Sequence, residues 1–537
     1  MKHRRYLFFL MVFMTVAILQ ACGNNSSSSS NGNASSAGTL SVLVTDAPGD
    51  FDHAYITVKD IWFHTSSTAG PNEAGWVKKP LAAPITVDLL TLANGDMQAL
   101  WSGVSLAAGN YQQIRLILAG TEDILTASAQ SMNLQYNNEV VTGNTVSPLH
   151  VPDALHGIKL NGVFTVAAGG TLRLAIDFDA GHDIVDFRTG EYVLKPRLTY
   201  FDLDHAGAII GKLAVASGGS ITTPRFVIKA ERLTSDGTNT YHMVKRWTVP
   251  KPDGTFILYP VSTLVTGTWD VVVRGLGHQT VIIKGVPITT GSMPASGATD
   301  LGTITMTAAG VPDYAVTGAI ASPTGSWVQF YQTLPGSGEY PYEIRFRHFN
   351  PLTGAFTTPF PLSNDVLQVG TYGTPTITLT PMTAVGGSGS YRAAAGAVLY
   401  DRSAYQTVSS ASMVSFGALT VSSPYQGNTV TGMISMATST MNNMMNRGVL
   451  FAVQGGMIMN AINIGSNGGG QIASGGTYTF TNLPGGSVAL PLHGAFYGIE
   501  AVGWSSSLTA TKAFAVPQTV DLRTGNDMAD MTMLPLP

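Results

Sequence analysis

The fold is decided by two neighbouring stretches, DGTFIL at residues 253–258 and GTWDVVVRGLGHQTVIIKGVPI at residues 267–288. An Asp-Gly turn opens the first stretch, and Phe256 and Leu258 then alternate toward one face, as side chains of a strand do. The second stretch alternates in the same way from Trp269 onward. Together they predict two strands of a packed β-sandwich.

Two further copies of this pattern follow along the chain, at intervals of 111 to 115 residues. That interval is too long for a solenoid repeat and suits a whole sandwich domain. The opening segments are Gly207-Ala208-Ile209, Gly318-Ala319-Ile320 and Gly432-Met433-Ile434. The central segments are Asp253–Phe256, Thr353–Phe356 and Gly475–Tyr478, and the closing segments are Thr303–Met306, Ala418–Val421 and Asp530–Met533.

The first copy resembles the transthyretin-like, carboxypeptidase-regulatory-like sandwich of bacterial surface proteins. The resemblance covers residues 253–258, residues 267–288 and LGTITM at residues 301–306. It implies a β-sandwich with a carbohydrate-binding-like fold. The fold alone does not confer sugar binding.

Residues 39–203 have a different pattern, with seven segments that suit strands and their turns. These are TLSVLVT (39–45), AYITVKDIWFH (54–64), VDLLTLANGD (87–96), AAGNYQQIRLIL (107–118), HGIKL (156–160), LAIDFDAGHDIV (174–185) and GEYVLKPRL (190–198). Taken in order, they resemble the bacterial exported domain called domain of unknown function 4382. The resemblance implies a β-rich domain and supplies no activity.

The N-terminus resembles a bacterial lipoprotein signal. Basic residues precede an apolar run from Tyr6 to Leu19, and Leu19-Gln20-Ala21-Cys22 resembles a lipobox. This predicts a lipid on Cys22 and a cell-envelope location, at the outer membrane by analogy with enteric lipoproteins. The alternative is an ordinary secretory signal in which Cys22 is incidental. Residues 23–38, GNNSSSSSNGNASSAG, have the composition of a flexible tether.

These observations predict an all-β protein in which a β-rich N-terminal domain precedes three tandem β-sandwich domains. The composition agrees, since 60 glycines and 28 prolines suit many short strands joined by tight turns. The expected segments are a signal peptide (1–21), a lipidated tether (22–38), a β-rich domain (39–203), and sandwiches at 204–310, 311–424 and 425–537. Charged residues make up only 11% of the chain, so nothing indicates a nucleic-acid partner.

Two clusters of acidic residues are candidate cation sites in the N-terminal domain. One comprises Asp46, Asp50 and Asp52, and the other comprises Asp177, Asp179 and Asp183 with His182 beside them. Carboxylates at alternating loop positions suit a hard cation such as calcium. Alternatively, the acids close turns or form salt bridges, with Arg173, Lys195 and Arg197 as internal partners.

Aromatic and methionine residues supply the remaining candidates. Trp247, Trp327 and Trp504 could stack on a sugar, and residues 345–349 alternate basic and aromatic side chains. The alternative is that these rings belong to the core. Thioethers could hold Cu(I), or could simply fill a core, at Met433, Met436, Met441, Met444, Met445, Met457 and Met459.

The sequence has none of the catalytic motifs considered: no Gly-x-Ser-x-Gly, His-Glu-x-x-His, P-loop or Gly-x-Gly-x-x-Gly pattern. The interpretation is therefore a non-catalytic envelope lipoprotein that acts as a surface binding or scaffold protein, with a glycan or an envelope protein as partner. The rival is a metal-dependent or carboxylate-based hydrolase with its site in the N-terminal domain. Convergence of the two acidic clusters in one cleft, with shifted pKa values, would favour the hydrolase.

Overall fold

The computed structural model describes residues 37–535 except 122, 187–191, 217–220, 222–225, 266, 292–296, 322–324, 352, 362–365, 374–375, 387–390, 410–412, 437–446, 465–475, 487–495, 505–511 and 524. Among these, helix is confined to α1 (Ala127–Ser131), α2 (Ala180–Asp183) and the 3-10 turns η1 (Leu89–Leu92) and η2 (Leu203–His205). The predicted all-β class is confirmed. No helix in the described part is long and apolar enough to cross a membrane.

The N-terminal domain consists of two packed sheets. In the described part, one sheet has the order β12 (Thr199–Asp202), β9 (Thr171–Asp179), β1 (Ala37–Ala47), β4 (Gln98–Ala107). The other has the order β10 (Ile184–Asp186), β11 (Tyr192–Leu194), β7 (Thr145–His150), β6 (Glu139–Thr142), β2 (His53–His64), β5 (Gly109–Leu118), β8 (Ile158–Val166), with β3 (Val77–Asp88) paired to β2. Alternate residues of β1 are buried, and they join a core that includes Phe63, Leu116 and Phe178.

Each sequence repeat forms the same small sheet, with its opening strand in the centre. The three sheets are β16 (Thr255–Ser262), β13 (Ala206–Val215), β19 (Thr299–Met306); β23 (Ala355–Phe360), β20 (Tyr314–Ile320), β28 (Val414–Phe416); and β32 (Thr477–Gly485), β29 (Gln426–Met436), β36 (Met531–Pro535). The opening strand pairs antiparallel with the central strand and parallel with the closing strand. The repeats are therefore three copies of one structural element.

The structure corrects the alignment of the first repeat. The backbone N–H of Leu213 donates to Gly254 O at 2.8 Å, as that of Ile320 donates to Gly354 O at 2.8 Å. In the third repeat the N–H of Ile434 donates to Gly476 O at 2.9 Å. Leu213 is therefore the equivalent of Ile320 and Ile434, so Gly211 and not Gly207 matches Gly318 and Gly432.

Packing explains why a glycine recurs at that position. Gly211, Gly318 and Gly432 each pair across the sheet with an aromatic residue of the central strand. A side chain on any of them would collide with that ring. The closing strand of the second repeat also lies earlier than predicted, at Val414–Phe416. The predicted residues 418–421 form only an isolated bridge, from Val421 to Tyr400.

The first two sandwich units, residues 204–310 and 311–424, share one continuous sheet rather than forming separate sandwiches in a row. Its order is β25 (Thr380–Thr383), β24 (Val366–Thr371), β18 (Thr280–Val286), β17 (Trp269–Gly275), β14 (Phe226–Ser235), β15 (Thr240–Thr248), β22 (Tyr342–His348), β21 (Trp327–Gln332), β26 (Arg392–Gly396), β27 (Gln406–Thr407). The outer strands β15 and β18 of the first unit pair in parallel with β22 and β24 of the second. This pairing satisfies strand edges that independent sandwiches would leave open.

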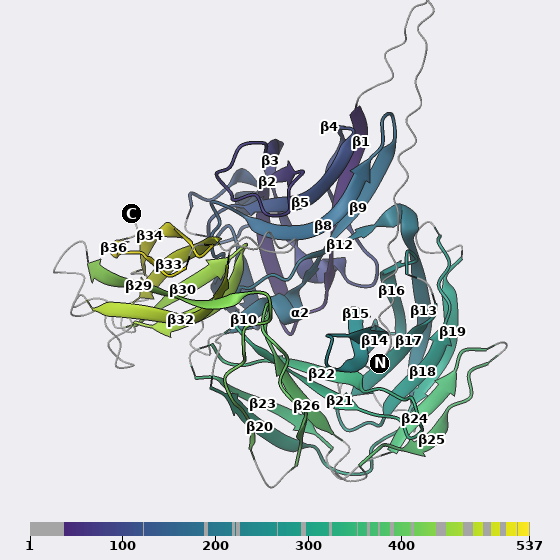
Figure 1. Ribbon diagram of the computed structural model, residues 1–537. Helices are drawn as coiled ribbons and strands as arrows, with labels where there is room; N and C mark the ends of the chain where they lie inside the picture. The colour runs from purple at the N-terminus through teal and green to yellow at the C-terminus, as the bar shows by residue number, and fades with distance from the viewer. Residues whose placement is uncertain are drawn as a thin grey trace, which may run out of the picture.

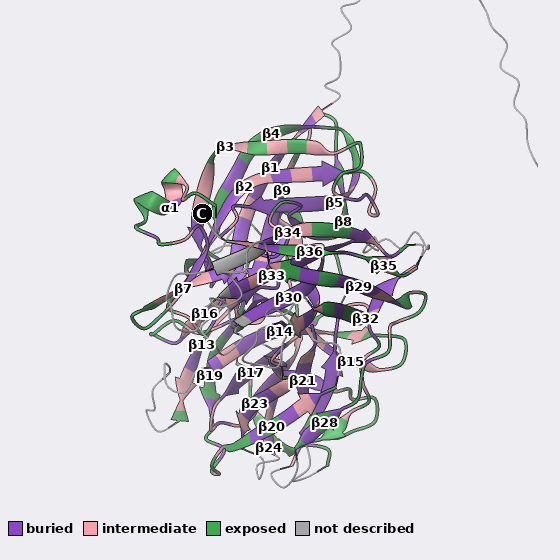
Figure 2. Ribbon diagram, turned by 90° about the vertical axis from the view of Figure 1, so that its left-hand side faces the viewer, coloured by how far each residue is buried: buried purple, intermediate pink, exposed green. Residues whose placement is uncertain are grey.

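The third sandwich unit, residues 425–537, closes its own sheets together. β36 pairs with both β29 and β34, so one sheet also contains β31 (Met457–Asn463), β30 (Arg447–Gln454), β33 (Phe496–Trp504), β34 (Lys512–Asp521) and β35 (Asp527–Met528). Its core is continuous with that of the second unit, from Phe356 to Phe480 and Met533. Figure 2 shows the buried residues running along the stacked strands, with exposed ones interspersed on β29 and β32.

The N-terminal domain contacts all three sandwich units, and the four parts together form a ring (Figure 1). Asn94 donates its side-chain amide to Val249 O of the first unit at 3.2 Å. Lys195 donates its ammonium group to Gly325 O of the second unit. Lys159 donates its backbone N–H to Gly455 O of the third unit at 2.9 Å. The ring places α2, β15 and β22 around a common centre (Figure 1).

Candidate functional site

The two predicted acidic clusters meet at one end of the N-terminal domain. β1 and β9 pair in parallel, with Asp46 opposite Phe178, so both strands end at the same edge of the sheet. Asp46 is fully buried, and its Oδ1 accepts the backbone N–H of Ala180 at 2.9 Å. Asp50 and Asp52 lie farther along the loop and are exposed. Of the first cluster, Asp46 therefore lies beside the acids of β9 and α2.

The segment after β9 is folded by its own carboxylates. Asp179 caps α2 by accepting the backbone N–H of His182 at 3.2 Å. Asp183 ends the same turn, and its two oxygens accept the backbone N–H groups of Arg197 at 3.0 Å and Asp179 at 3.2 Å. Asp183 thus has a structural role, because it joins α2 to the chain that leads into β12.

The first sandwich unit covers these acids with two neighbouring residues of β15. Arg246 forms a buried ion pair with Asp177, and its Nη2 also donates to Thr45 Oγ1 at 3.1 Å and to Asp46 O at 3.0 Å. Trp247 donates its indole N–H to Asp179 Oδ2 at 2.9 Å. The internal partners expected from the sequence do not take this role. Arg173 pairs with Asp204 instead, and Arg197 contributes its backbone N–H to Asp183.

Burial shifts the pKa values of these acids apart. Burial raises the pKa of Asp46 well above its ordinary value, and it raises the pKa of Asp177 to about 6 against the opposing charge of Arg246. Burial and the negative charge of Asp179 raise the pKa of Asp183 to about 8. Burial also acts on Asp179, but the charge and hydrogen bond of His182 outweigh it and lower the pKa of that carboxyl.

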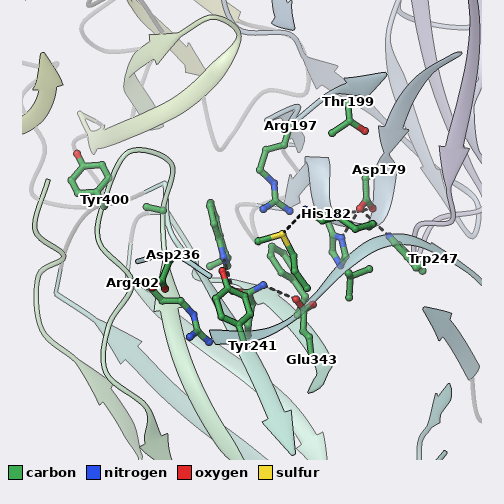
Figure 3. A pocket seen from close by; sticks show the side chains of 18 of the residues that line it. Asp179, His182, Arg197, Thr199, Asp236, Tyr241, Trp247, Glu343, Tyr400 and Arg402 are labelled. Carbon is green, nitrogen blue, oxygen red and sulfur yellow. Dashed lines mark hydrogen bonds and ion pairs between the residues drawn. The ribbon is translucent and has the colours of Figure 1, made fainter. Parts of the chain in front are cut away.

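Asp177, Asp179 and Asp183 border a cleft of about 410 Å³ where the N-terminal domain and the first two sandwich units meet; we call it the central cleft. Figure 3 shows Arg197 reaching from the N-terminal domain toward Tyr241 and Glu343 of the sandwich units. The lining of the central cleft is mainly polar, charged and aromatic. Its residues are Asp177, Asp179, His182, Asp183, Arg197, Thr199, Asp236, Thr238, Asn239, Tyr241, Met243, Val244, Lys245, Arg246, Trp247, Trp327, Gln329, Glu343, Phe346, Gly396, Ala397, Tyr400, Asp401, Arg402 and Ser422.

Two arginines of the cleft wall lie on aromatic rings. The guanidinium of Arg197 lies 4.5 Å from the ring centre of Trp327 and 4.8 Å from that of Phe346. The guanidinium of Arg402 lies 4.5–4.6 Å from three tyrosine rings, those of Tyr241, Tyr331 and Tyr405. All three nitrogens of Arg402 are buried among these rings.

Two of the three predicted stacking residues therefore line the cleft. Trp247 is largely buried, since its edge binds Asp179 and its ring packs 5.1 Å from that of His182. Trp327 is half-buried and stacks at 26° on Phe346. Trp504 is the last residue of β33, and its side chain lies outside the described part of the chain.

The remaining candidates of the sequence lie elsewhere. Asp52 accepts the N–H of Gly143 at 2.6 Å, in the turn between β6 and β7. Among the described residues, no three His, Cys, Asp or Glu side chains are arranged to hold a metal ion, and the calcium site stays a hypothesis. Met457 and Met459 belong to the core, whereas the candidate copper ligands Met441, Met444 and Met445 lie outside the described residues.

The sequence analysis missed Arg246 and Arg402 altogether. Arg246 directly precedes Trp247, which was predicted to stack on a sugar. Its bonds reach Asp177 and Asp46, which lie 69 and 200 residues earlier in the chain. Arg402 lies in the second sandwich unit and belongs to none of the motifs found in the sequence. Only the ring arrangement of the units brings these residues to the cleft.

Comparison with known proteins identifies the N-terminal part of the chain. Residues 37–196 match the family model described as "Domain of unknown function (DUF4382)", which confirms the resemblance found for this segment. A search of the curated proteins finds no match. The carboxypeptidase-regulatory-like resemblance of the first sandwich unit stays a prediction.

Several solved structures are similar over much of the chain, at low scores. They include the Bacillus anthracis TIE protein (7% identity, 90% of this chain and 69% of that chain, TM-score 0.13). They also include two B repeat units of the collagen-binding protein of Staphylococcus aureus (8%, 93% and 99%, TM-score 0.13) and the major pilin SpaD of Corynebacterium diphtheriae (8%, 62% and 99%, TM-score 0.14). At these TM-scores the similarities support no conclusion about this chain.

Proposed function

We propose that this chain is a non-catalytic lipoprotein of a bacterial cell envelope, and that its central cleft binds a glycan. The observation that carries the proposal is the lining of the cleft, where aromatic rings, arginines and small polar groups from three parts of the chain face one volume. The lipid on Cys22 anchors the chain to the membrane, and residues 23–38 serve as the tether.

The chemistry of the lining suits a sugar. Sugar rings pack their C–H faces on aromatic side chains, while hydroxyl groups need both donors and acceptors placed around the rim. Asp236, Thr238 and Asn239 supply such groups from the turn between β14 and β15. Gln329 supplies an amide beside Trp327 on β21. The volume of about 410 Å³ lies within the range of small-ligand sites.

The docked arrangement of the units supports a binding role rather than that of a loose spacer. The cleft exists only because the N-terminal domain contacts the sandwich units through bonds such as Trp247 to Asp179. A preformed cleft avoids the ordering cost that flexible domains would meet on binding. The sandwich units therefore act both as scaffold and as part of the site.

A carboxylate-based hydrolase is the second candidate, because Asp177 and Asp179 line the cleft with pKa values shifted in opposite directions. The protein's own groups, however, bind Oδ1 of Asp177 and both oxygens of Asp179. Asp177 pairs with Arg246, and Asp179 Oδ2 accepts from both His182 Nδ1 at 2.6 Å and Trp247 Nε1 at 2.9 Å. This bonding favours a structural role for the two carboxylates and the non-catalytic proposal.

Binding to a panel of immobilised envelope and plant glycans tests the proposal. We expect the purified protein to bind at least one glycan, and we expect Trp327→Ala and Asn239→Ala each to weaken that binding at least tenfold. Asn239 lies in an exposed turn, so its variant keeps the fold if Trp327→Ala does not. Trp62→Ala is the matched control, because Trp62 lies under Lys78 on the N-terminal domain and outside the cleft.

Two results would contradict the proposal. Equal glycan binding by wild-type protein and both cleft variants would place the site elsewhere, and no binding across the panel would exclude a glycan ligand of the kinds tested. Release of reducing sugar during incubation, lost in Asp177→Asn, would instead establish the hydrolase.

A further inference from the structure

A second cavity, of about 360 Å³, lies next to the central cleft and shares His182, Trp247 and Phe346 with it. Its other walls come from the loop after β1, from α2, and from β14, β17 and β22. Its lining residues are Pro48, Asp50, Gly181, His182, Val227, Lys229, Trp247, Arg274, Gly275, Leu276, Ile344, Arg345, Phe346, Arg347 and Pro359. We call it the cationic pocket, because three arginines and a lysine face one carboxylate.

Arg274 has bonding capacity that the described residues do not fill. The residue is only 4% exposed, and its Nη1 donates to the carbonyl of His278. Its Nε and Nη2 are buried without a hydrogen-bond partner among the described residues. A buried guanidinium with two unused donors costs free energy unless something else in the pocket accepts from it.

The other cations of the pocket are bonded mainly to carbonyl groups. Arg345 donates from Nη1 to Pro359 O at 3.0 Å, and Arg347 donates from Nη1 to Phe346 O at 3.0 Å. Lys229 lies 3.6 Å from Glu343 Oε1, which is the acid that balances it. In the described part of the chain none of the three arginines forms an ion pair, so positive charge exceeds negative charge here.

The electrostatic surroundings of Arg345 agree with this excess. Burial lowers the pKa of Arg345 well below its ordinary value, and the charges of Arg347 and Arg274 lower it further. Asp313 opposes this shift from outside the pocket lining, where its Oδ2 accepts the N–H of Gly277 at 3.0 Å. An anion among the arginines would remove much of this cost.

We propose that the cationic pocket is a binding site for a small oxyanion, which Arg274, Arg345 and Arg347 hold. Arginines bind phosphate, sulfate and carboxylate groups through paired N–H donors, and buried pairs of this kind are the strong ones. The three side chains come from β17 and β22 of different sandwich units, so an anion here would also tie the two units together. The site differs from the central cleft in its excess of positive charge, and none of its three arginines lines that cleft.

Thermal unfolding of the purified protein tests this proposal, with inorganic phosphate, sulfate and acetate as probes at constant ionic strength. We expect phosphate or sulfate to raise the melting temperature in a saturable way, since a ligand that binds the folded state stabilises it. A shift with acetate alone would assign the pocket to a carboxylate group. Titration of phosphate by calorimetry gives the dissociation constant directly.

Arg347→Gln should weaken phosphate binding at least tenfold, because one of the three guanidinium groups is lost while the half-buried site tolerates an amide. Arg392→Gln is the matched control, since Arg392 is an exposed arginine of β26 outside the pocket. Arg274→Gln provides a second test if it folds. No saturable shift with any probe, or an undiminished shift in Arg347→Gln, would overturn the proposal.

Discussion

Trp247 of β15 donates its indole N–H to the carboxylate of Asp179 at 2.9 Å, and this bond joins the first sandwich unit to the N-terminal domain. The sequence marked both residues as ligand-binding candidates, yet here each is the other's partner. Gly181 packs directly against the tryptophan ring, where a Cβ would lie 2.9 Å from it. The contact therefore fixes α2 against β15 and shapes one wall of the central cleft.

Trp247→Phe should destabilise the protein by about 1–3 kcal/mol, because a partly buried carboxylate loses a donor. The free energy of unfolding from urea denaturation measures this change. The matched control is Trp62→Phe, which removes an indole bond to Asp60 at a half-buried position within the N-terminal domain. An equal or smaller loss for Trp247→Phe would contradict an interdomain role for the bond.

The proposed lipid anchor leads to a second prediction. Cys22→Ala should move the protein from the membrane fraction to the soluble fraction, or leave it as an uncleaved precursor, because the acyl chains would have no thiol to join. Fractionation and immunoblotting after signal cleavage measure this. A cleaved Cys22→Ala protein that stays with the membrane would contradict lipid anchoring.

The acidic loop leads to a third prediction, about calcium. We expect millimolar calcium to leave the melting temperature unchanged, since Oδ1 of Asp46 and both oxygens of Asp179 and of Asp183 accept hydrogen bonds from the protein itself. A saturable rise that disappears in Asp50→Asn would contradict this and restore a calcium site in the loop. Magnesium at the same ionic strength is the control for general salt effects.

Local patterns made most of the fold predictable. Equivalent strands do follow the Asp-Gly turn before Phe256 and the corresponding positions before Phe356 and Tyr478. They were predictable because turn residues and the alternation of apolar side chains act within a few residues. The alignment error at Gly207 arose because two glycines, Gly207 and Gly211, occur on the same strand. Only the pairing of Gly211 with Phe256 distinguishes them.

The candidate site was less predictable, because its residues come together through sheet sharing and docking. Nothing near His242 indicates that β15 pairs with β22, about 100 residues later, at Tyr342. Such edge-to-edge pairing depends on which strand edges remain open after the local sheets form. That pairing brings Tyr241 of β15 beside Tyr331 of β21, where the guanidinium of Arg402 lies on both rings. Asp177 meets Arg246 through the docking of the first sandwich unit on the N-terminal domain, and no motif indicates either contact.

Lys195 gives the clearest pH dependence. Its side chain is 4% exposed and donates to Gly325 O, across the contact between the N-terminal domain and the second sandwich unit. Burial, together with the charge of Arg197 and against that of Asp183, lowers its pKa from 10.5 to about 7. At pH 8 the folded chain therefore holds a neutral amine where the unfolded chain holds a cation.

From about pH 7 to about pH 10 the unfolded state thus binds one more proton at Lys195 than the folded state does, so this residue makes the free energy of unfolding rise with pH. In Lys195→Met we expect that slope to fall by at most about 1.4 kcal/mol per pH unit. Urea denaturation at pH 7, 8 and 9 measures it, and groups that titrate in both proteins cancel in the difference. Lys212→Met, at an exposed position of β13, should leave the slope unchanged. Parallel pH profiles for wild type and Lys195→Met would mean that the folded protein keeps this buried lysine charged.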